Sequence, residues 1–318
     1  MIDAEVEQLL RSDAPLVIIE APAGCGKTHQ AANYTERAGK ELSRGKVLVL
    51  THTHAACSVI AERTKGVQRF VDIRTLDSLV FQIASAYRLS LDLPEDVASW
   101  ARKQSDGYGL LATKTAKLLE VNPMICINIA RHFPIVICDE HQDANENQDA
   151  IVRLIQTAGA TVRVFADPMQ IIPGGNAQQR LAASAHQRWE AIKASGSFGN
   201  LESPHRWNKT NPELGAWIQS VRLALHNHVP INLSSNLPDS VQIIYAENGI
   251  PANRKYQIRP DNWTKLNAIV DQDRSMLLLA SNNEIISGLR SSLQRRIPIW
   301  EGHKASKHCS RHSPGRLS

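Results

Sequence analysis

The sequence predicts an α/β fold in which a parallel sheet carries helices on both faces. Short apolar runs, of the kind buried in parallel sheets, occur at 16–19, 47–50 and 134–138, and a further strand is expected at 162–165. Polar stretches with helical spacing separate the runs, and this alternation implies right-handed parallel crossovers. A glycine-rich loop directly after the first run is the third indication, because such loops join a strand to a helix.

The glycine-rich loop, residues 21–28, reads Ala-Pro-Ala-Gly-Cys-Gly-Lys-Thr. Its backbone N–H groups can surround the β- and γ-phosphates of a nucleotide, and the start of the next helix adds partial positive charge. Lys27 can reach the terminal phosphates, and the Thr28 hydroxyl can ligate Mg²⁺. Ala21 stands where the general pattern has its first glycine, and an ordinary glycine-rich turn is the competing interpretation.

An acidic motif, Asp-Glu-His-Gln-Asp, follows the apolar run at 134–138. Ligands of open α/β sheets bind at the carboxyl ends of the strands, so this motif and the glycine-rich loop should face one crevice. Asp139 would then hold Mg²⁺, and Glu140 would orient and deprotonate an attacking water. An acidic loop that caps the following helix is the competing interpretation, and the nearby phosphate loop argues against it.

Taken in order, these segments resemble the motifs of superfamily 1 DNA helicases of the UvrD/Rep/PcrA type. The Asp-Glu-x-Gln-Asp signature at 139–143 is matched in full and is more specific than a plain Asp-Glu pair. The other matches are the loop at 21–28, Thr-His-Thr-His-Ala-Ala at 51–56, Thr-Leu-Asp-Ser at 75–78, Ala-Asp-Pro-Met-Gln at 166–170 and Leu-Glu-Ser-Pro-His-Arg at 201–206. The segment at 51–56 is one residue shorter than its counterpart in the family. The resemblance covers roughly residues 8 to 300.

The resemblance implies a RecA-like P-loop NTPase that couples ATP hydrolysis to single-stranded DNA binding and 3′–5′ movement. Catalysis would depend on Glu140, on Gln170 as a sensor of the γ-phosphate, and on Arg206 as an arginine finger. Thr28 and Asp139 would hold Mg²⁺. The residues expected to hold ATP are Gln8, Ala21, Pro22, Ala23, Gly24, Cys25, Gly26, Lys27 and Thr28.

Single-stranded DNA is the expected partner, through hydroxyl-to-phosphate contacts that position a strand without reading its sequence. The expected contacts are Thr51, His52, Thr53, Thr75 and Ser78. Several residues keep a competing interpretation: an exposed helical glutamine for Gln8, a helix cap for Thr75, a turn for Gln170 and a solvated surface cation for Arg206.

The chain also departs from the family. No aromatic or basic residue follows Gln170 over 171–177, and His52 replaces the family's phenylalanine. Since base stacking on an aromatic contributes about 1–3 kcal/mol per base, the grip on a single strand should be weaker. Nothing similar to the late family motifs follows, so we expect a chain truncated before them or completed by a partner. The alternative function is a partner-dependent ATP-binding regulatory subunit of a DNA repair or phage-defence nuclease complex, without autonomous unwinding.

The motifs predict three regions. Residues 1–198 would form a RecA-like lobe with a small helical insert over about 90–131, and residues 199–300 would form an incomplete second RecA-like lobe. The second lobe is expected to contain a buried strand at 276–280. Residues 301–318 are polar and basic and lack a hydrophobic period, which is typical of a disordered tail.

Composition narrows the class of protein. Hydrophobic residues make up 42% and charged residues 21% of the 318 residues, as in globular proteins. The net charge of +5 permits nucleic-acid binding, although much of the excess lies near the end of the chain. Five cysteines without paired spacing indicate a reducing, cytoplasmic setting. No apolar run approaches the length that spans a membrane, so no membrane partner is expected.

Overall fold

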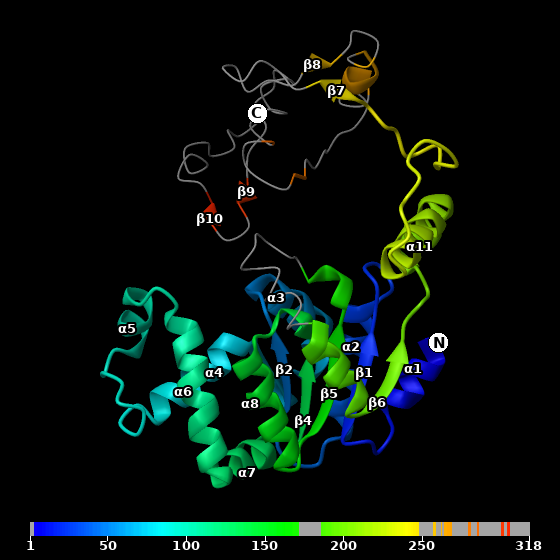
Figure 1. The fold of residues 1–318 in the computed structure, drawn as a ribbon. Coiled ribbons are helices and arrows are strands. Elements are labelled where there is room, and N and C mark those ends of the chain that lie inside the picture. Colours follow the sequence, from blue (N-terminus) through cyan, green and yellow to red (C-terminus); the bar gives the residue numbers. More distant parts are fainter. Residues whose placement is uncertain are drawn as a thin grey trace, which may run out of the picture. The chain divides into compact units, whose positions relative to one another are not determined.

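The computed structural model describes residues 3–171 and 186–247, together with short stretches at 257–258, 262, 264–268, 279–280, 285, 300–301 and 304–305. The chain divides into two compact units, Met1–Ile231 and Asn232–Ser318. Figure 1 shows the helices and strands of both units. The first unit contains the sheet and all of the motifs singled out above.

Six strands form the sheet of the first unit, and all of their pairings are parallel. Their order across the sheet is β3-β2-β4-β5-β1-β6, so the strand before the phosphate loop lies beside the strands that carry the later motifs. This arrangement confirms the predicted α/β fold with a parallel sheet. The strands are β1 (Leu16–Glu20), β2 (Val47–Thr51), β3 (Val71–Thr75), β4 (Ile135–Cys138), β5 (Thr161–Ala166) and β6 (Ser197–Asn200).

Helices cover both faces of the sheet. Successive residues of a strand point to opposite sides, and the strands carry apolar side chains on both sides, so both faces are buried. On β1, Leu16 and Ile18 pack against one set of helices, while Val17 and Ile19 pack against the other. The first set is α4 (Leu76–Ala86), α8 (Glu146–Thr157), the helical insert described next and the helix at 186–194. The second set is α1 (Asp3–Leu10), α2 (Lys27–Glu41), α3 (His54–Arg63) and the 3₁₀ segment η1 (Lys65–Phe70).

The helical insert predicted over about 90–131 contains three helices, α5 (Val97–Lys103), α6 (Gly107–Val121) and α7 (Pro123–His132). Leu111 and Leu119 of α6 are completely buried, and α6 packs against both α4 and α8. In Figure 1 this group of helices lies at the side of the sheet next to α4. The insert is therefore joined to the sheet through α4 and α8.

After the sheet, α10 (His205–Asn208) and α11 (Pro212–His226) complete the described part of the first unit. The predicted lobe boundary lies after residue 198, whereas the two compact units divide after Ile231. The reason for the difference is that β6 pairs with β1 and α10 packs on the phosphate loop, which attaches the segment after 198 to the sheet. The assignment of residues 199–300 to a second RecA-like lobe stays a prediction.

In the second unit the described strands are pairs of two-residue antiparallel segments. β7 (Ala246–Glu247) pairs with β8 (Gln257–Ile258), and β9 (Trp300–Glu301) pairs with β10 (Lys304–Ala305). Of the strand expected at 276–280, the structure describes Leu279 and Ala280, and neither lies in a strand. Most of the tail expected at 301–318 lies outside the described residues. Across the described part of the whole chain, no helix combines the length and the apolar character needed to cross a membrane.

Candidate functional site: a phosphate loop facing two carboxylates

The phosphate loop leaves β1 at Glu20 and enters α2 at Lys27. Gly24 and Gly26 have φ angles of 83° and 86°, which a glycine adopts without the steric cost that a Cβ would add. Gly26 is the N-cap of α2, and no side chain caps the helix there. The N–H groups of the first turn of α2 are therefore oriented toward an anion at the loop, where the helix dipole also favours negative charge.

Two carboxylates after β4 face this loop. The Lys27 Nζ donates a hydrogen bond to the Glu140 carboxylate, and the Thr28 hydroxyl donates to Asp139 Oδ2 at 3.3 Å. Glu140 has a left-handed backbone with φ of 55°, an unusual conformation for a residue with a side chain. The amide of Gln142 also donates to Glu140 Oε2, at 2.7 Å. The Glu140 carboxylate is thus held from two sides.

Asp139 is almost completely buried, and its environment stabilises the protonated form. Burial and the nearby Glu140 carboxylate raise the pKa of Asp139 to about 6, against the opposing effect of Lys27. A buried carboxylate next to a hydroxyl is a set of hard oxygen donors that suits Mg²⁺. A divalent cation would also compensate the repulsion between the two carboxylates. The residues therefore fit the cation that the sequence predicts, with Thr28 and Asp139 as its protein ligands.

The segment after β5 joins the same site through Asp167, which is inaccessible to solvent. Gln170 donates from Nε2 to Asp167 Oδ2 at 2.9 Å, and the backbone N–H of Asp167 donates to Gln142 Oε1 at 3.0 Å. Asp167 also accepts two hydrogen bonds from Arg222 of α11, at 2.6 and 3.1 Å. Gln170 belongs to the 3₁₀ segment η3 (Pro168–Gln170), as expected for a turn after a strand.

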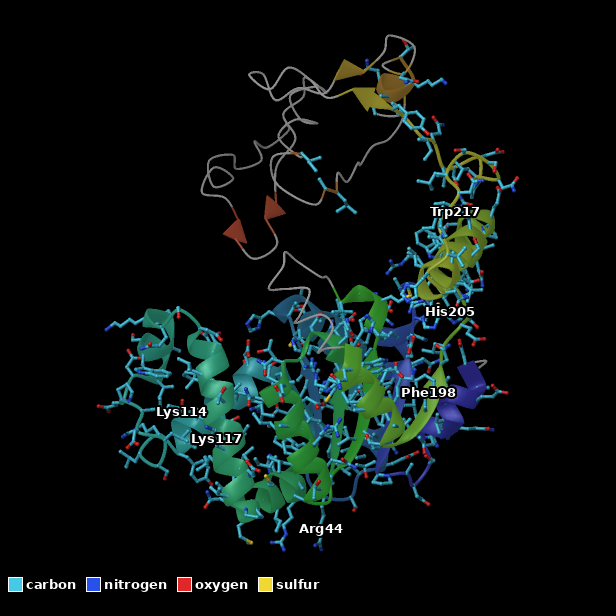
Figure 2. The ribbon with its side chains drawn as sticks, in the orientation of Figure 1. Arg44, Lys114, Lys117, Phe198, His205 and Trp217 are labelled. Carbon is cyan, nitrogen blue, oxygen red and sulfur yellow. The ribbon has the colours of Figure 1, made fainter. Side chains whose placement is uncertain are left out.

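The segment His205–Trp207 packs directly on the phosphate loop. The N–H of Arg206 donates to the Gly24 carbonyl at 3.1 Å, and a Cβ added at Gly24 would lie 3.0 Å from the Trp207 indole nitrogen. His205 contacts Asp3 of α1 at 2.6 Å. Figure 2 shows His205 between the sheet edge at β6 and α11. Arg206 is thus held beside the phosphate loop by backbone contacts, although it is about 180 residues away in sequence.

A cavity of about 550 Å³ opens over the loop and collects most of the predicted residues. Lys27, Thr28, Glu140, Gln170 and Arg206 all line it. The described residues that line it are Pro22, Ala23, Gly24, Gly26, Lys27, Thr28, His29, Arg63, Glu140, Gln170, His205 and Arg206. This is the volume of an ordinary ligand pocket, and its cations gather around the loop that would hold phosphate.

Three of the predicted nucleotide-binding residues lie elsewhere. Ala21 is buried and its N–H donates to the Ala166 carbonyl at 2.9 Å, which extends the pairing of β1 with β5. Cys25 is buried in the core beneath the loop, and that burial raises the pKa of its thiol. Gln8 lies on the exposed face of α1 and is not among the described residues that line the cavity. Its position matches the competing interpretation of an exposed helical glutamine.

The residues expected to contact DNA lie at the carboxyl ends of β2 and β3. Thr51 and Thr75 are direct partners in the β2–β3 register. Their hydroxyls are engaged locally: Thr51 donates to the Thr53 carbonyl at 3.1 Å, and Thr75 donates to the Ser78 hydroxyl at 2.9 Å. Thr53 and Thr75 also cap α3 and α4 by accepting from the N–H groups of Ala56 and Ser78. The helix cap expected as the competing interpretation of Thr75 is present.

His52 is partly buried rather than presented as a flat stacking surface. Its Nε2 atom is inaccessible and has no hydrogen-bond partner among the described residues. Burial, with a smaller effect from His141, lowers the pKa of His52 to about 4. The imidazole is therefore neutral near pH 7.

Sequence reasoning missed four cations or potential cations of this site, the first of which is His29, directly after Thr28 in the cavity lining. Arg63, at the end of α3, lines the cavity and contacts His29 Nδ1 at 2.8 Å. His205 lines the same cavity, and Arg222 reaches Asp167 from α11. His205 lies inside the recognised segment 201–206 and could have been singled out there. A lone arginine on an amphipathic helix has no spacing signature, so nothing in the sequence distinguishes Arg63 or Arg222 from surface residues.

Comparison with known proteins identifies a family to which the chain is matched. The family model described as an AAA domain matches residues 6–176, which is more than half of the chain. No curated protein matches the chain. Among solved structures, AMPPCP-bound DnaA from Aquifex aeolicus is similar over 72% of this chain and 50% of that chain, with 13% sequence identity and a TM-score of 0.28. The chain thus spans about half the length of that DnaA chain.

Proposed function

The chain belongs to the AAA domain family, and on that premise we propose that it is an ATP-dependent DNA translocase of the UvrD/Rep/PcrA type. In this proposal, ATP hydrolysis is coupled to single-stranded DNA binding and to 3′–5′ movement. The family and the parallel sheet with its phosphate loop make the first unit a P-loop nucleotide-binding domain. The substrate and the coupling are the proposed part.

One observation carries the proposal: parts of the chain that are far apart in sequence converge on one cavity. The phosphate loop supplies Lys27 and Thr28, the segment after β4 supplies Glu140, and the segment after β5 supplies Gln170. Arg206, from the segment that resembles a helicase motif, completes the lining. An ordinary glycine-rich turn does not explain why an ion pair and a second cation face the same loop.

Each residue has a defined task in hydrolysis. Lys27 and the N–H groups at the start of α2 bind the terminal phosphates of ATP. When bound by Thr28 and Asp139, Mg²⁺ supplies positive charge that offsets the charge of the triphosphate. Glu140 orients a water molecule and accepts its proton, while Gln142 fixes the carboxylate by its 2.7 Å hydrogen bond. Arg206 stabilises the negative charge on the transferred phosphoryl group.

The experiment that tests the proposal is steady-state ATP hydrolysis by the purified chain, with and without a single-stranded oligonucleotide. Glu140→Gln serves as the blank, because it retains the fold of the site and loses the proton acceptor. Turnover that exceeds the blank and rises with DNA supports a DNA-coupled ATPase. Turnover that exceeds the blank but does not change when DNA is added would mean that the chain is an ATPase whose activity is not coupled to DNA.

The proposed DNA contact is supported by the position of Thr51, Thr53 and Thr75 at the carboxyl ends of neighbouring strands. Anisotropy of a labelled oligothymidine can test it through Thr53→Ala, since Thr53 is exposed at the start of α3. Ser58→Ala, one turn later on the same helix, is the matched control. Loss of affinity in both variants, or in neither, would argue against a contact at Thr53.

A second candidate is an ATP-binding regulatory subunit that acts with a partner, such as the nuclease of a DNA repair or phage-defence complex. The observation that favours it is the burial of the His52 ring nitrogen, since a ring used for base stacking should be accessible. In the ATPase experiment, ATP binding without turnover above the blank would support this candidate.

A further inference from the structure

Arg222 of α11 connects the ends of two adjacent strands. Its guanidinium donates two hydrogen bonds to Asp167, directly after β5, and lies 3.7 Å from the Glu20 carboxylate at the end of β1. β1 leads into the phosphate loop, and β1 and β5 are paired in parallel. One side chain on a later helix is therefore attached to both strands that bound the nucleotide site.

The contacts of Asp167 continue from Arg222 to Glu140. The backbone N–H of Asp167 donates to Gln142, and the amide of Gln142 donates in turn to Glu140. A second branch reaches Gln170, which donates to Asp167 Oδ2 and lines the cavity. Among the described hydrogen bonds, those of Arg222 go to Asp167 and not to a residue that lines the cavity, and two residues, Asp167 and Gln142, connect it to Glu140.

The two hydrogen bonds between Arg222 and Asp167 have the geometry that fixes a carboxylate most firmly. A guanidinium offers donors in a planar fork, and a carboxylate that accepts two of them cannot rotate without breaking one. The Asp167 side chain is inaccessible to solvent and the Arg222 side chain is 22% exposed, so little water competes for these contacts. A lysine could supply the charge, but it could not supply the planar fork.

We infer that Arg222 is a positioning residue for ATP hydrolysis: it fixes Asp167, and through Gln142 and Gln170 it sets the orientation of Glu140 and of the γ-phosphate sensor. The inference rests on the proposed ATPase activity. It assigns to α11 a role in catalysis that the motif at 201–206 does not include. The alternative is that Arg222 only neutralises the buried charge of Asp167 and so stabilises the fold. The experiment must distinguish this alternative from a role in positioning.

The test compares kcat, KM for ATP and melting temperature in four variants. Arg222→Gln removes the charge and the fork, Arg222→Lys keeps the charge, and Asp167→Asn combined with Arg222→Gln removes the buried charge together with its partner. Lys193→Gln is the matched control, because Lys193 also lies near the Glu20 carboxylate, at 3.9 Å, and is 28% exposed, but is bonded to Glu20 and Glu190 rather than to Asp167.

We expect Arg222→Gln to lower kcat by about 10- to 100-fold, the effect of misplacing a catalytic group slightly, while KM changes less than about threefold. Arg222→Lys should recover part of kcat, and Lys193→Gln should leave it unchanged. The combined variant should recover melting temperature without recovering kcat. A wild-type kcat in Arg222→Gln overturns the inference, and so does recovery of both properties in the combined variant.

Hydrogen exchange at residues 139–143 tests the inference about Arg222 independently of the proposed ATPase activity. If wild-type turnover equals that of Glu140→Gln, the proposed hydrolysis fails, but the positioning of Glu140 can still be measured. Faster exchange in Arg222→Gln than in Lys193→Gln then supports the contact path from Arg222 to Glu140. Equal exchange in these two variants overturns it.

Discussion

Lys27 and Glu140 form an ion pair, although 113 residues separate them in sequence. The ammonium is nearly buried, with 7% of its side chain exposed, whereas the carboxylate is 30% exposed. The side chain expected to bind the terminal phosphates is therefore bonded to the side chain expected to accept the proton from water. Because a phosphate and a carboxylate both attract the ammonium, ATP must share or replace this partner, and changes at either residue have distinct consequences.

Lys27→Ala should lower ATP affinity by about 100-fold or more, since charge-assisted hydrogen bonds to the terminal phosphates are lost. Calorimetric titration with ATP and Mg²⁺ measures the affinity directly. The control is Lys40→Ala on the same helix, where the lysine is 61% exposed and pairs with Glu36 at 2.6 Å. An exposed pair of this kind contributes little, so the control should bind as wild type does. Wild-type affinity in Lys27→Ala would refute the phosphate-loop assignment.

Glu140→Gln should retain or increase ATP affinity while turnover falls by about 100- to 10,000-fold, the usual contribution of a positioned general base. Affinity is retained because the neutral glutamine amide, unlike the Glu140 carboxylate, does not compete with the ATP phosphates for the Lys27 ammonium. Binding titrations and single-turnover hydrolysis separate the two properties.

Glu146→Gln is the control for this prediction, because Glu146 is exposed in the first turn of α8. Its loss affects only the interaction with the helix dipole, about 0.3–1 kcal/mol, and turnover should stay near that of wild type. If Glu140→Gln hydrolyses ATP as fast as this control, another group accepts the proton.

The sequence predicts the interior strands of the sheet better than its edges. β1, β2, β4 and β5 are buried on both faces and read as mainly apolar runs, which only Arg163 of β5 interrupts. β3 and β6 are the edge strands, with the sequences VDIRT and SFGN, and they lack such a run. For the same reason the predicted lobe boundary falls within β6, because nothing in its sequence indicates pairing with β1.

The residues of the candidate site likewise fall into those that the sequence predicts and those that it does not. Residues that follow a buried strand, such as Lys27, Asp139 and Gln170, are predictable because parallel strands end at one edge of the sheet. Arg206 is predictable from its resemblance to a family motif, and its position beside Gly24 supports that interpretation. Arg222 is not predictable, since its role depends on how α11 packs over the strand ends.

Gly24→Ala should weaken ATP binding, because a Cβ at this position forces the segment that covers the loop to shift slightly and strains a backbone with a positive φ. The added atom would lie 3.0 Å from the Trp207 indole nitrogen and 3.1 Å from the Arg206 Cβ. Displacing Arg206 and straining the loop should reduce ATP affinity by about tenfold or more. Titration with ATP measures this loss.

Gly159→Ala is the control for the backbone strain in that variant. Gly159 has a φ of 110°, but a Cβ there would meet no atom within 4 Å. Both variants should lose about 1–2 kcal/mol of unfolding free energy from the unfavourable φ, and only Gly24→Ala should lose ATP affinity. Equal ATP affinity in the two variants would show that the contact of Trp207 and Arg206 with Gly24 does not matter for binding.

Because His52 is partly buried, we expect it to lower the free energy of unfolding in acid. Burial lowers its pKa to about 4 in the folded protein, from 6.5, so the unfolded chain binds a proton that the folded chain rejects. Relative to His52→Gln, the wild type should therefore lose about 2–4 kcal/mol of unfolding free energy as the pH falls from 7.5 to 4, with most of the loss below pH 6.5. Urea unfolding of both proteins across this pH range measures the difference, in which titrations common to both proteins cancel. If the free energy of unfolding depends on pH in the same way in both proteins, the His52 ring is solvated. A solvated ring would again be a candidate for base stacking.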